Sequence, residues 1–201
     1  VDLYADLSDA LAAIGPVDVV IIAAPLGAHF RLATLALNAG ADVYLEKPPV
    51  ASLDDFTALL QLQQQSGRAV QIGFQSLGSH ALQMFTRDDF GIGEVLKVSA
   101  LGAWSRTVGY WTRSPWAGRR SLGGEPVVDG VVTNALAHAV VTALAVVGCR
   151  QLEDVESVAT DLYRANRIDS DDTSVVRIRT AEGLEVTCAL TLCASVERKP
   201  L

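Results

Sequence analysis

Short runs of apolar residues alternate with amphipathic segments along the first third of the chain. The runs at 17–23, 42–45 and 69–73 have the length of strands, and the first consists mainly of Val and Ile. Because it is apolar at nearly every position, we expect this first strand to be buried on both faces. Segments of helical length lie between the runs, from about Ala28 to Gly40 and from Ser52 to Gly67. Strands that alternate with helices in this way predict a parallel sheet with right-handed crossovers.

Capping residues mark the limits of the two predicted helices. Ser52 is a typical N-cap, and Asp54 and Asp55 follow it in the first turn, where negative charge is favourable. Gly40 and Gly67 are typical of the residue just past a helix C-terminus. The sequence therefore predicts the ends of these helices as well as their existence.

The pattern changes in the second part of the chain. An apolar stretch at 96–104 predicts a strand, and Thr133 to Val147 predicts a strongly apolar helix. Apolar and polar residues then alternate cleanly at 175–180 and at 184–192, on either side of a short turn. This alternation predicts an antiparallel hairpin with one covered face.

The two patterns divide the 201 residues into two domains. We predict an α/β fold in which residues 1–75 form a partial parallel sheet of the Rossmann type. Residues 76–201 are expected to form an α+β domain with an open antiparallel sheet.

Composition narrows the possible partners. Half of the residues are apolar, which is enough for a sizeable core, and the formal net charge is −7 with no basic run. A polyanion would be repelled, so we expect neither nucleic acid nor an acidic membrane surface as a partner. No apolar run has membrane-spanning length. The three cysteines lack metal-ligand spacing, so we expect no metal site.

Two segments follow predicted parallel strands, where ligands of open α/β sheets bind. Ala24 to His29 begins a helix, whose free N–H groups favour a polar or anionic ligand. Glu46-Lys47-Pro48 places a lysine directly after a strand, and its ammonium group could donate to a reacting oxygen. A single Lys-Pro is more often part of a solvated loop, so Lys47 alone does not decide between these interpretations.

Together, these segments resemble the Gfo/Idh/MocA oxidoreductase family (glucose–fructose oxidoreductase and inositol dehydrogenase). The resemblance covers about a third of the chain and rests on Val19-Ile-Ile-Ala-Ala-Pro25, His29, Ala39-Gly40 and Glu46-Lys47-Pro48. It implies NAD or NADP as cofactor, with Lys47 beside the nicotinamide ribose, where it helps to bind and polarise the substrate. The residues assigned to the cofactor groove are Ala24, Pro25, Leu26, His29, Glu46, Lys47 and Gln75.

The resemblance extends to the apolar helix of the second domain. The family has an aspartate and, four residues later, an acid/base histidine at the start of such a helix. Here Asn134 and His138 occupy these positions, so His138 is implied to be the acid/base group and Asn134 to orient it from the same helix face. Asp129 is a possible substitute for the missing carboxylate. Without the resemblance, His138 would be interpreted as a hydrogen-bonded core histidine.

The glycine-rich phosphate-binding motif of the family has no counterpart in this sequence. Gly91-Ile-Gly93 is followed by a predicted strand rather than a helix, so it does not fit the motif. The family's first βαβ unit is expected to precede Val1, and its last strands and helix to follow Leu201. The residue that separates NAD from NADP would lie in that preceding unit.

A segment rich in aromatic residues and arginine, at 104–120, is the candidate substrate region. It contains all three tryptophans and four arginines, which suit a polyhydroxylated or carboxylated ligand but are also common in oligomer interfaces. Trp116 and Arg119 are the substrate-binding candidates.

The favoured function is reversible hydride transfer between NAD(P) and a carbinol carbon of a sugar, inositol or related polyol. Two alternatives remain: glycoside cleavage with a bound NAD and no net redox change, and a non-catalytic sugar or dinucleotide sensor on the same fold. The resemblance also implies a homodimer or homotetramer built through the antiparallel sheet. We expect the protein to be cytoplasmic.

Overall fold

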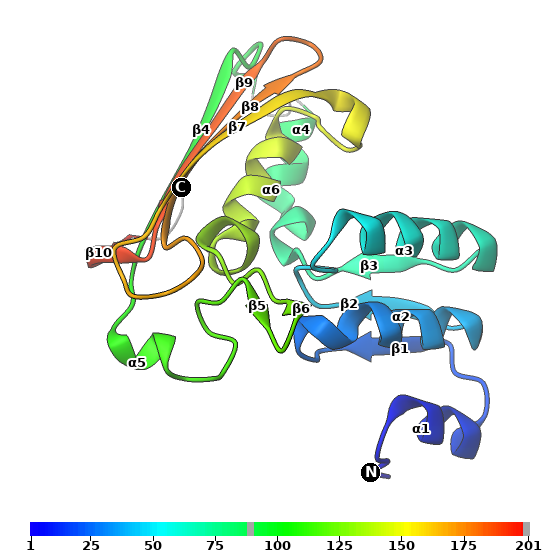
Figure 1. The fold of residues 1–201 in the computed structure, drawn as a ribbon. Helices are drawn as coiled ribbons and strands as arrows, with labels where there is room; N and C mark the ends of the chain where they lie inside the picture. The colour runs from blue at the N-terminus through cyan, green and yellow to red at the C-terminus, as the bar shows by residue number, and fades with distance from the viewer. Residues whose placement is uncertain (88–90, 199–201) are drawn as a thin grey trace. The chain divides into compact units, whose positions relative to one another are not determined.

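The computed structural model describes residues 1–87 and 91–198 (Figure 1). The chain forms two compact units, and the main boundary lies between Gly73 and Phe74, close to the expected residue 75. The first unit comprises Val1–Gly73 with Glu125–Val127, and the second comprises Phe74–Gly124 with Val128–Leu201. No helix of the described residues is long and apolar enough to cross a membrane.

The first unit contains the predicted parallel sheet, with strand order β1-β2-β3. Its elements are α1 (Leu7–Ile14), β1 (Val19–Ile22), the 3-10 helix η1 (Leu26–Ala28), α2 (His29–Asn38), β2 (Asp42–Leu45), α3 (Leu53–Ser66) and β3 (Val70–Ile72). The strand β6 (Glu125–Pro126) also belongs to this unit. The alternation of strands and helices predicted from the sequence is confirmed.

The helix limits also agree with the sequence. The Ser52 hydroxyl accepts a hydrogen bond of 3.1 Å from the Asp55 N–H, which satisfies one of the free N–H groups at the start of α3. Gly67 adopts a φ of +65° at the end of α3, and Gly40 adopts +80° after α2. L-residues with side chains rarely adopt these angles, so glycine is the natural terminator at both positions.

Among residues 1–87 and 91–198, helices α2 and α3 cover one face of the parallel sheet. Ile22, Val43 and Leu45 are buried against α2 and α3 in one cluster. On the other face, Val19 and Ile21 are 54% and 73% exposed, so within the described residues β1 is buried on one face and not, as predicted, on both. Successive side chains of a strand point to opposite faces, and both packed helices lie on the same one.

The second unit is built on a five-stranded sheet with order β10-β4-β9-β8-β7 (Figure 1). Its strands are β4 (Lys97–Ser105), β5 (Ser121–Leu122), β7 (Val155–Tyr163), β8 (Thr173–Thr180), β9 (Glu185–Thr191) and β10 (Cys193–Arg198). Its helical elements are η2 (Gln75–Gly78), α4 (His80–Thr86), α5 (Val108–Trp111), the π-helix η3 (Val131–Ala135), α6 (Ala137–Val146) and η4 (Leu152–Asp154).

The predicted hairpin is confirmed, because β8 and β9 pair antiparallel with Val176 opposite Cys188. The sheet as a whole is mixed, however, since β4 and β9 run parallel. After β4 the chain crosses through α6 and then forms the antiparallel meander β7-β8-β9. As a result, β9 runs in the same direction as its neighbour β4. A crossover of this kind is what parallel neighbours require.

The helix α6 covers one face of the mixed sheet. Ala139 and Ala143 of this helix pack in one cluster with Ala100, Val186 and Leu190 of the strands. The opposite face carries cross-strand ion pairs, with Arg177 2.7 Å from Asp161 and Arg179 3.0 Å from Glu156. The clean alternation of the hairpin therefore separates a core face from a polar face.

Candidate functional site

At the carboxyl edge of the parallel sheet, His29 links two loops. Its ring is 2% exposed, with Nε2 2.8 Å from the Ala24 carbonyl oxygen and Nδ1 2.9 Å from that of Pro48. These oxygens belong to the loops that follow β1 and β2. A neutral imidazole donates from one ring nitrogen only, so the ring contacts both loops and donates to one of the two oxygens, or to both when both nitrogens carry a proton. His29 therefore fixes the loop of Pro25 relative to the loop of Lys47.

The same edge holds Glu46 and Lys47 at half-buried positions. The Glu46 N–H donates to the Ile22 carbonyl oxygen at 2.9 Å, and the Gly73 N–H donates to the Leu45 oxygen at 2.8 Å, so the ladder extends beyond each strand. A Cβ atom at Gly73 would lie 3.1 Å from Glu46 Oε2. The absence of a side chain at position 73 thus leaves room for the Glu46 carboxylate.

The remaining cofactor candidates fall into two groups. Ala24, Pro25 and Leu26 surround the start of η1, and Pro25 is exposed while the other two are half-buried. Together with Glu46 and Lys47 they place apolar surface and two charged groups at the edge where α/β folds bind nucleotides, which fits a nicotinamide and its ribose. Gln75 is an exposed residue of η2 and belongs to the second unit.

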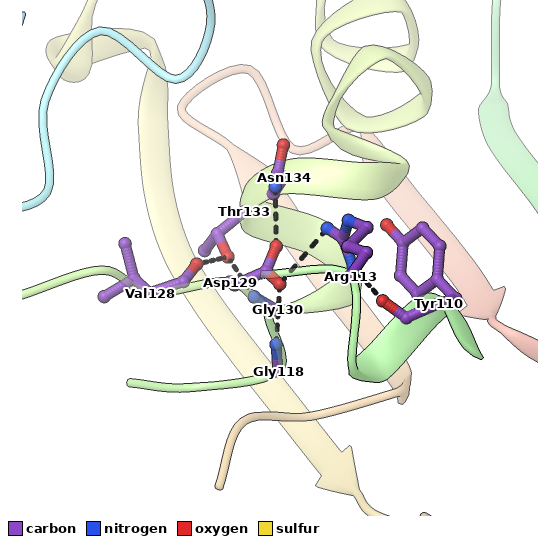
Figure 2. Close-up of polar contacts among 8 residues, drawn as sticks. All are labelled: Tyr110, Arg113, Gly118, Val128, Asp129, Gly130, Thr133 and Asn134. Atoms are coloured by element: carbon purple, nitrogen blue, oxygen red, sulfur yellow. Dashed lines mark hydrogen bonds and ion pairs between the residues drawn. The ribbon is translucent and has the colours of Figure 1, made fainter. Parts of the chain in front are cut away.

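In the second unit, Asp129 is the centre of a buried polar cluster (Figure 2). It is 4% exposed, and its Oδ1 accepts a hydrogen bond of 2.6 Å from Asn134 Nδ2. Its Oδ2 accepts from the Gly118 N–H at 2.7 Å and lies 3.6 Å from Arg113 Nη2. A buried carboxylate needs such partners to offset its desolvation. Asp129 therefore joins the aromatic–arginine segment to the candidate catalytic helix.

The backbone before Asp129 is strained. Val128 has a φ of +45°, which is rare for a β-branched residue. The Val128 carbonyl oxygen accepts from the Thr133 hydroxyl (Figure 2). It also accepts from the Gly130 N–H at 2.8 Å. Thr133 in turn accepts from the Gly130 N–H at 3.0 Å. These contacts hold a conformation that would otherwise be unfavourable by about 1–3 kcal/mol.

A second aspartate, Asp171, supports the same turn from a distant part of the chain. Its Oδ2 accepts from the Val131 N–H at 3.2 Å and from the Ser174 hydroxyl at 2.6 Å. A Cβ atom at Gly130 would overlap Asp171 Oδ1, so this close approach requires glycine. No sequence motif indicated Asp171, although acidic residues cluster at 169–172.

The start of the candidate catalytic helix differs from the prediction. A continuous helix from Thr133 is wrong, because the π-helix at Val131–Ala135 precedes α6 and Leu136 interrupts them with φ −116°. The Leu136 N–H donates to the Val131 carbonyl oxygen at 2.7 Å, which is an i to i+5 contact. Asn134 and His138 therefore lie on opposite sides of a helix junction and not on one regular α-helix. Single π turns of this kind are frequent at functional sites.

His138 lies in the first turn of α6 and is half-buried. Its ring meets that of Phe74 edge-on, with the ring centroids 5.4 Å apart. The Thr142 hydroxyl, one turn further along, donates to Ser76 Oγ at 2.9 Å. The segment at 74–76 therefore packs along the helix face that carries the candidate histidine.

In the aromatic–arginine segment, the two substrate candidates have different surroundings. Arg113 stacks on Tyr110 and Trp116, with its Cζ atom 3.7 Å and 4.6 Å from the ring centroids. The face of Trp116 is thus occupied by an arginine that also contacts Asp129. Arg119 is exposed and lines a cavity of about 660 Å³ in the second unit.

Asp172 anchors one wall of this cavity. It is fully buried, and its carboxylate accepts hydrogen bonds from the backbone N–H groups of Ala165 and Asn166 at 2.8–3.0 Å. Burial raises the pKa of this carboxyl group, but the donated hydrogen bonds outweigh burial and hold the pKa below its usual value. Asp172 is therefore a structural anion that fixes the loop after β7.

Comparison with known proteins supports an oxidoreductase fold. Residues 1–74 match the Gfo/Idh/MocA oxidoreductase family, described as an NAD-binding Rossmann fold. No curated protein matches the sequence.

Solved structures match nearly the whole chain. The WlbA dehydrogenase from Bordetella pertussis, in complex with NADH and UDP-GlcNAcA, is 25% identical with a TM-score of 0.81; the match covers 96% of this chain and 54% of that protein. An oxidoreductase from Agrobacterium radiobacter, in complex with NAD+, L-tartaric acid and magnesium, is 16% identical with a TM-score of 0.78, over 96% and 53%. An inositol dehydrogenase homolog from Azotobacter vinelandii, complexed with NADH and myo-inositol, is 15% identical with a TM-score of 0.72, over 91% and 46%. The chain therefore spans about half the length of these proteins.

Proposed function

We propose that the whole protein transfers hydride between NAD(P) and a carbinol carbon of a sugar, inositol or related polyol. The match of residues 1–74 to the Gfo/Idh/MocA oxidoreductase family supports this proposal. The observation that carries the proposal is the pair of loops that His29 ties together at the carboxyl edge of the parallel sheet. One loop presents Pro25 and the other presents Glu46 and Lys47. The sugar and inositol ligands of the similar structures are consistent with this substrate class.

The residues of the first unit hold the cofactor and polarise the substrate. Ala24, Pro25 and Leu26 offer an apolar surface to the nicotinamide, and the Glu46 carboxylate can accept hydrogen bonds from ribose hydroxyls. The cofactor, when bound, supplies the hydride chemistry. Lys47 donates to the reacting oxygen, which stabilises the negative charge that develops there as the proton leaves.

The residues of the second unit handle the proton. In the direction of alcohol oxidation, a ring nitrogen of His138 takes the hydroxyl proton while the carbinol hydrogen leaves with its electron pair as hydride. Because Asn134 Nδ2 donates to Asp129, the orientation of the amide is fixed and its oxygen remains the acceptor end. Asn134 therefore acts as a positioning residue. Arg119 is the proposed contact to the substrate, and Trp116 supports Arg113.

The test is a turnover assay of the whole protein with NAD and NADP against a panel of sugars, inositols and glycosides. We expect reduced cofactor to accumulate with a polyol. Lys47→Met, which keeps the chain length and removes the charge, should lower kcat/KM by about a hundredfold or more. The control is Lys97→Met, since Lys97 lies on β4 in an exposed ion pair with Glu185.

The same assay separates the alternatives. If glycosides are cleaved and no reduced cofactor accumulates, the reaction is an elimination with no net redox change, and the proposed dehydrogenase function is contradicted. Tight cofactor binding with no turnover on any substrate would favour a sensor. A Lys47→Met variant with the wild-type rate would remove Lys47 from the mechanism.

We also propose a homodimer or homotetramer through the polar face of the mixed sheet. This face exposes Leu101 and Tyr163, at 62% and 57%, among the cross-strand ion pairs of Arg177 and Arg179. Exposed apolar residues within a charged rim are typical of interfaces. Light scattering of the whole protein tests the assembly, and a monomer mass for both wild type and Leu101→Glu would contradict it.

A further inference from the structure

A cavity of about 660 Å³ lies within the second unit, which is in the usual size range of small-molecule sites. Its walls come from two segments that are far apart in sequence, at 108–119 and 165–169. The polar and charged residues of the walls are Thr112, Ser114, Arg119, Asn166, Arg167 and Asp169. The cavity is thus a polar site that belongs to one compact unit.

Gly118 holds the two walls together. Its carbonyl oxygen accepts hydrogen bonds from the N–H groups of Asp169 and Ser170, both at 2.9 Å. Its φ is +68°, and a Cβ atom there would lie 2.7 Å from Ile168 Cγ2, so the close approach requires glycine. The Gly118 N–H donates to Asp129, whose other oxygen binds Asn134. The cavity wall is therefore connected to the proposed positioning residue through two hydrogen bonds.

The charge of the walls favours an anion. Arg119 and Arg167 contribute two positive charges and Asp169 one negative charge, against an overall charge of −7 for the chain. Within residues 1–87 and 91–198, neither Arg119 nor Arg167 has a side-chain hydrogen bond or ion pair, in contrast to Arg113. A guanidinium group has planar donors that match a carboxylate or phosphate, so unpaired arginines on a cavity wall suit such a ligand.

Neutral donors of the same walls add to this preference. Trp111 Nε1 and Ser114 Oγ are buried without a hydrogen-bond partner among the described residues, and both residues line the cavity. A buried unpaired donor is unfavourable, and an acceptor supplied by a ligand or its water would relieve it.

We propose that this cavity binds an anionic group of the substrate, a carboxylate or a phosphate carried on a sugar, with Arg119 and Arg167 as its ligands. The inference rests on the proposed function for the sugar and deepens it by naming the substrate class. It predicts that acidic sugars are preferred over neutral polyols.

The test is calorimetric titration of the whole protein with three probes: glucuronate, glucose 6-phosphate and glucose. We expect at least one anion to bind more tightly than glucose, and the stronger of the two identifies the group as carboxylate or phosphate. Arg119→Ala and Arg167→Ala should each weaken binding of that anion about tenfold or more, because each removes a charge-assisted contact.

The matched control is Arg120→Ala. Arg120 is adjacent to Arg119, also exposed and without a side-chain partner among the described residues. It lines not the cavity but a neighbouring groove of about 480 Å³, which shares only Asp169 with the cavity. This variant changes the net charge by the same amount, so we expect little loss of anion binding. An equal loss in Arg120→Ala would show a general charge effect and overturn the site.

Two further outcomes would overturn the proposal: unchanged anion binding in both cavity variants, or glucose binding as tightly as the anions. NAD and NADP titrations of the same samples keep this test separate from the proposed function. If the protein binds cofactor and turns over a neutral polyol but binds no anion, the anion subsite is contradicted and the oxidoreductase function is not. If the cavity variants lose anion binding but the wild type binds no cofactor, the anion subsite is supported and the oxidoreductase function is contradicted.

Discussion

Asn134 donates a hydrogen bond of 2.6 Å from its side-chain amide to the buried carboxylate of Asp129. The sequence shows an amide where the family usually has an aspartate, and the structure shows that a carboxylate is its direct partner. A carboxylate is therefore present at the start of the candidate catalytic helix, but it belongs to Asp129, the partner of Asn134, and not to residue 134 itself. The pair also fixes the orientation of the amide, with its nitrogen toward Asp129.

Asn134→Asp should destabilise the second unit at neutral pH, by about 1–3 kcal/mol, because it places two carboxylates in contact in a buried cluster. Two such groups share one proton, so the pKa of the pair is raised in the folded state. A raised pKa gives stability that is present at low pH and lost as the pH rises. Thermal unfolding should therefore show a smaller loss at pH 5 than at pH 7. Asn134→Ala adds no charge, and an equal pH dependence in both variants would contradict the argument.

His29→Ala should loosen the two loops that follow β1 and β2. The variant loses both ring contacts and leaves a cavity at a fully packed position, which should destabilise the first unit by about 2–4 kcal/mol. Hydrogen exchange of the amides of Glu46, Lys47 and Val50 measures this loosening locally, since Pro48 and Pro49 have no N–H group. His80→Ala is the control, since His80 begins α4 and is exposed. Unchanged exchange in His29→Ala would show that the loops hold without the ring.

Gly118→Ala and Gly123→Ala form a matched pair that isolates the packing between the cavity walls. Both glycines have positive φ, +68° and +61°, so both variants should lose about 1–2 kcal/mol for the backbone alone. A Cβ atom at Gly118 would lie 2.7 Å from Ile168 Cγ2 and clash with it, whereas a Cβ atom at Gly123 would have no neighbour within 4 Å. We expect Gly118→Ala to be the less stable by a further 1–3 kcal/mol or so, measured by chemical denaturation. Equal losses of stability in the two variants would mean that the loop of Ile168 can move away from the added Cβ atom at no measurable cost.

Asp172 should make the second unit sensitive to acid. Its pKa is below the usual 3.8 in the folded state, so its contribution to stability is complete above that value and is lost as the pH falls through the lower folded pKa. Asp172→Asn should be less stable than wild type at neutral pH, because an amide has one acceptor oxygen in place of two. The difference between the two proteins should shrink as the pH falls below about 3.8. Denaturant midpoints from pH 2 to pH 7 test this, and a constant difference would remove Asp172 as the acid-sensitive anchor.

Local signals in the sequence determined much of the fold. The run at 17–23, the cap at Ser52 and the turn at Gly67 predict β1 and α3 because strand length, side-chain capping and positive φ are properties of a few adjacent residues. The hairpin of β8 and β9 was predicted for the same reason, since alternation has a period of two residues. Lys47 and His138 became candidates through the motifs around them.

Contacts between distant residues decided the rest. The exposure of Ile21 depends on which face the neighbouring helices cover, and no pattern within β1 records it. The π-helix before α6 is held by Asp171, which is 40 residues away in the chain, so the helical period of Thr133 to Val147 could not reveal it. The site around Asp129 likewise exists only after folding, because Gly118 and Asn134 reach that carboxylate from separate segments. Hydrogen bonds to a buried charge depend on distance in space, which the order of residues does not state.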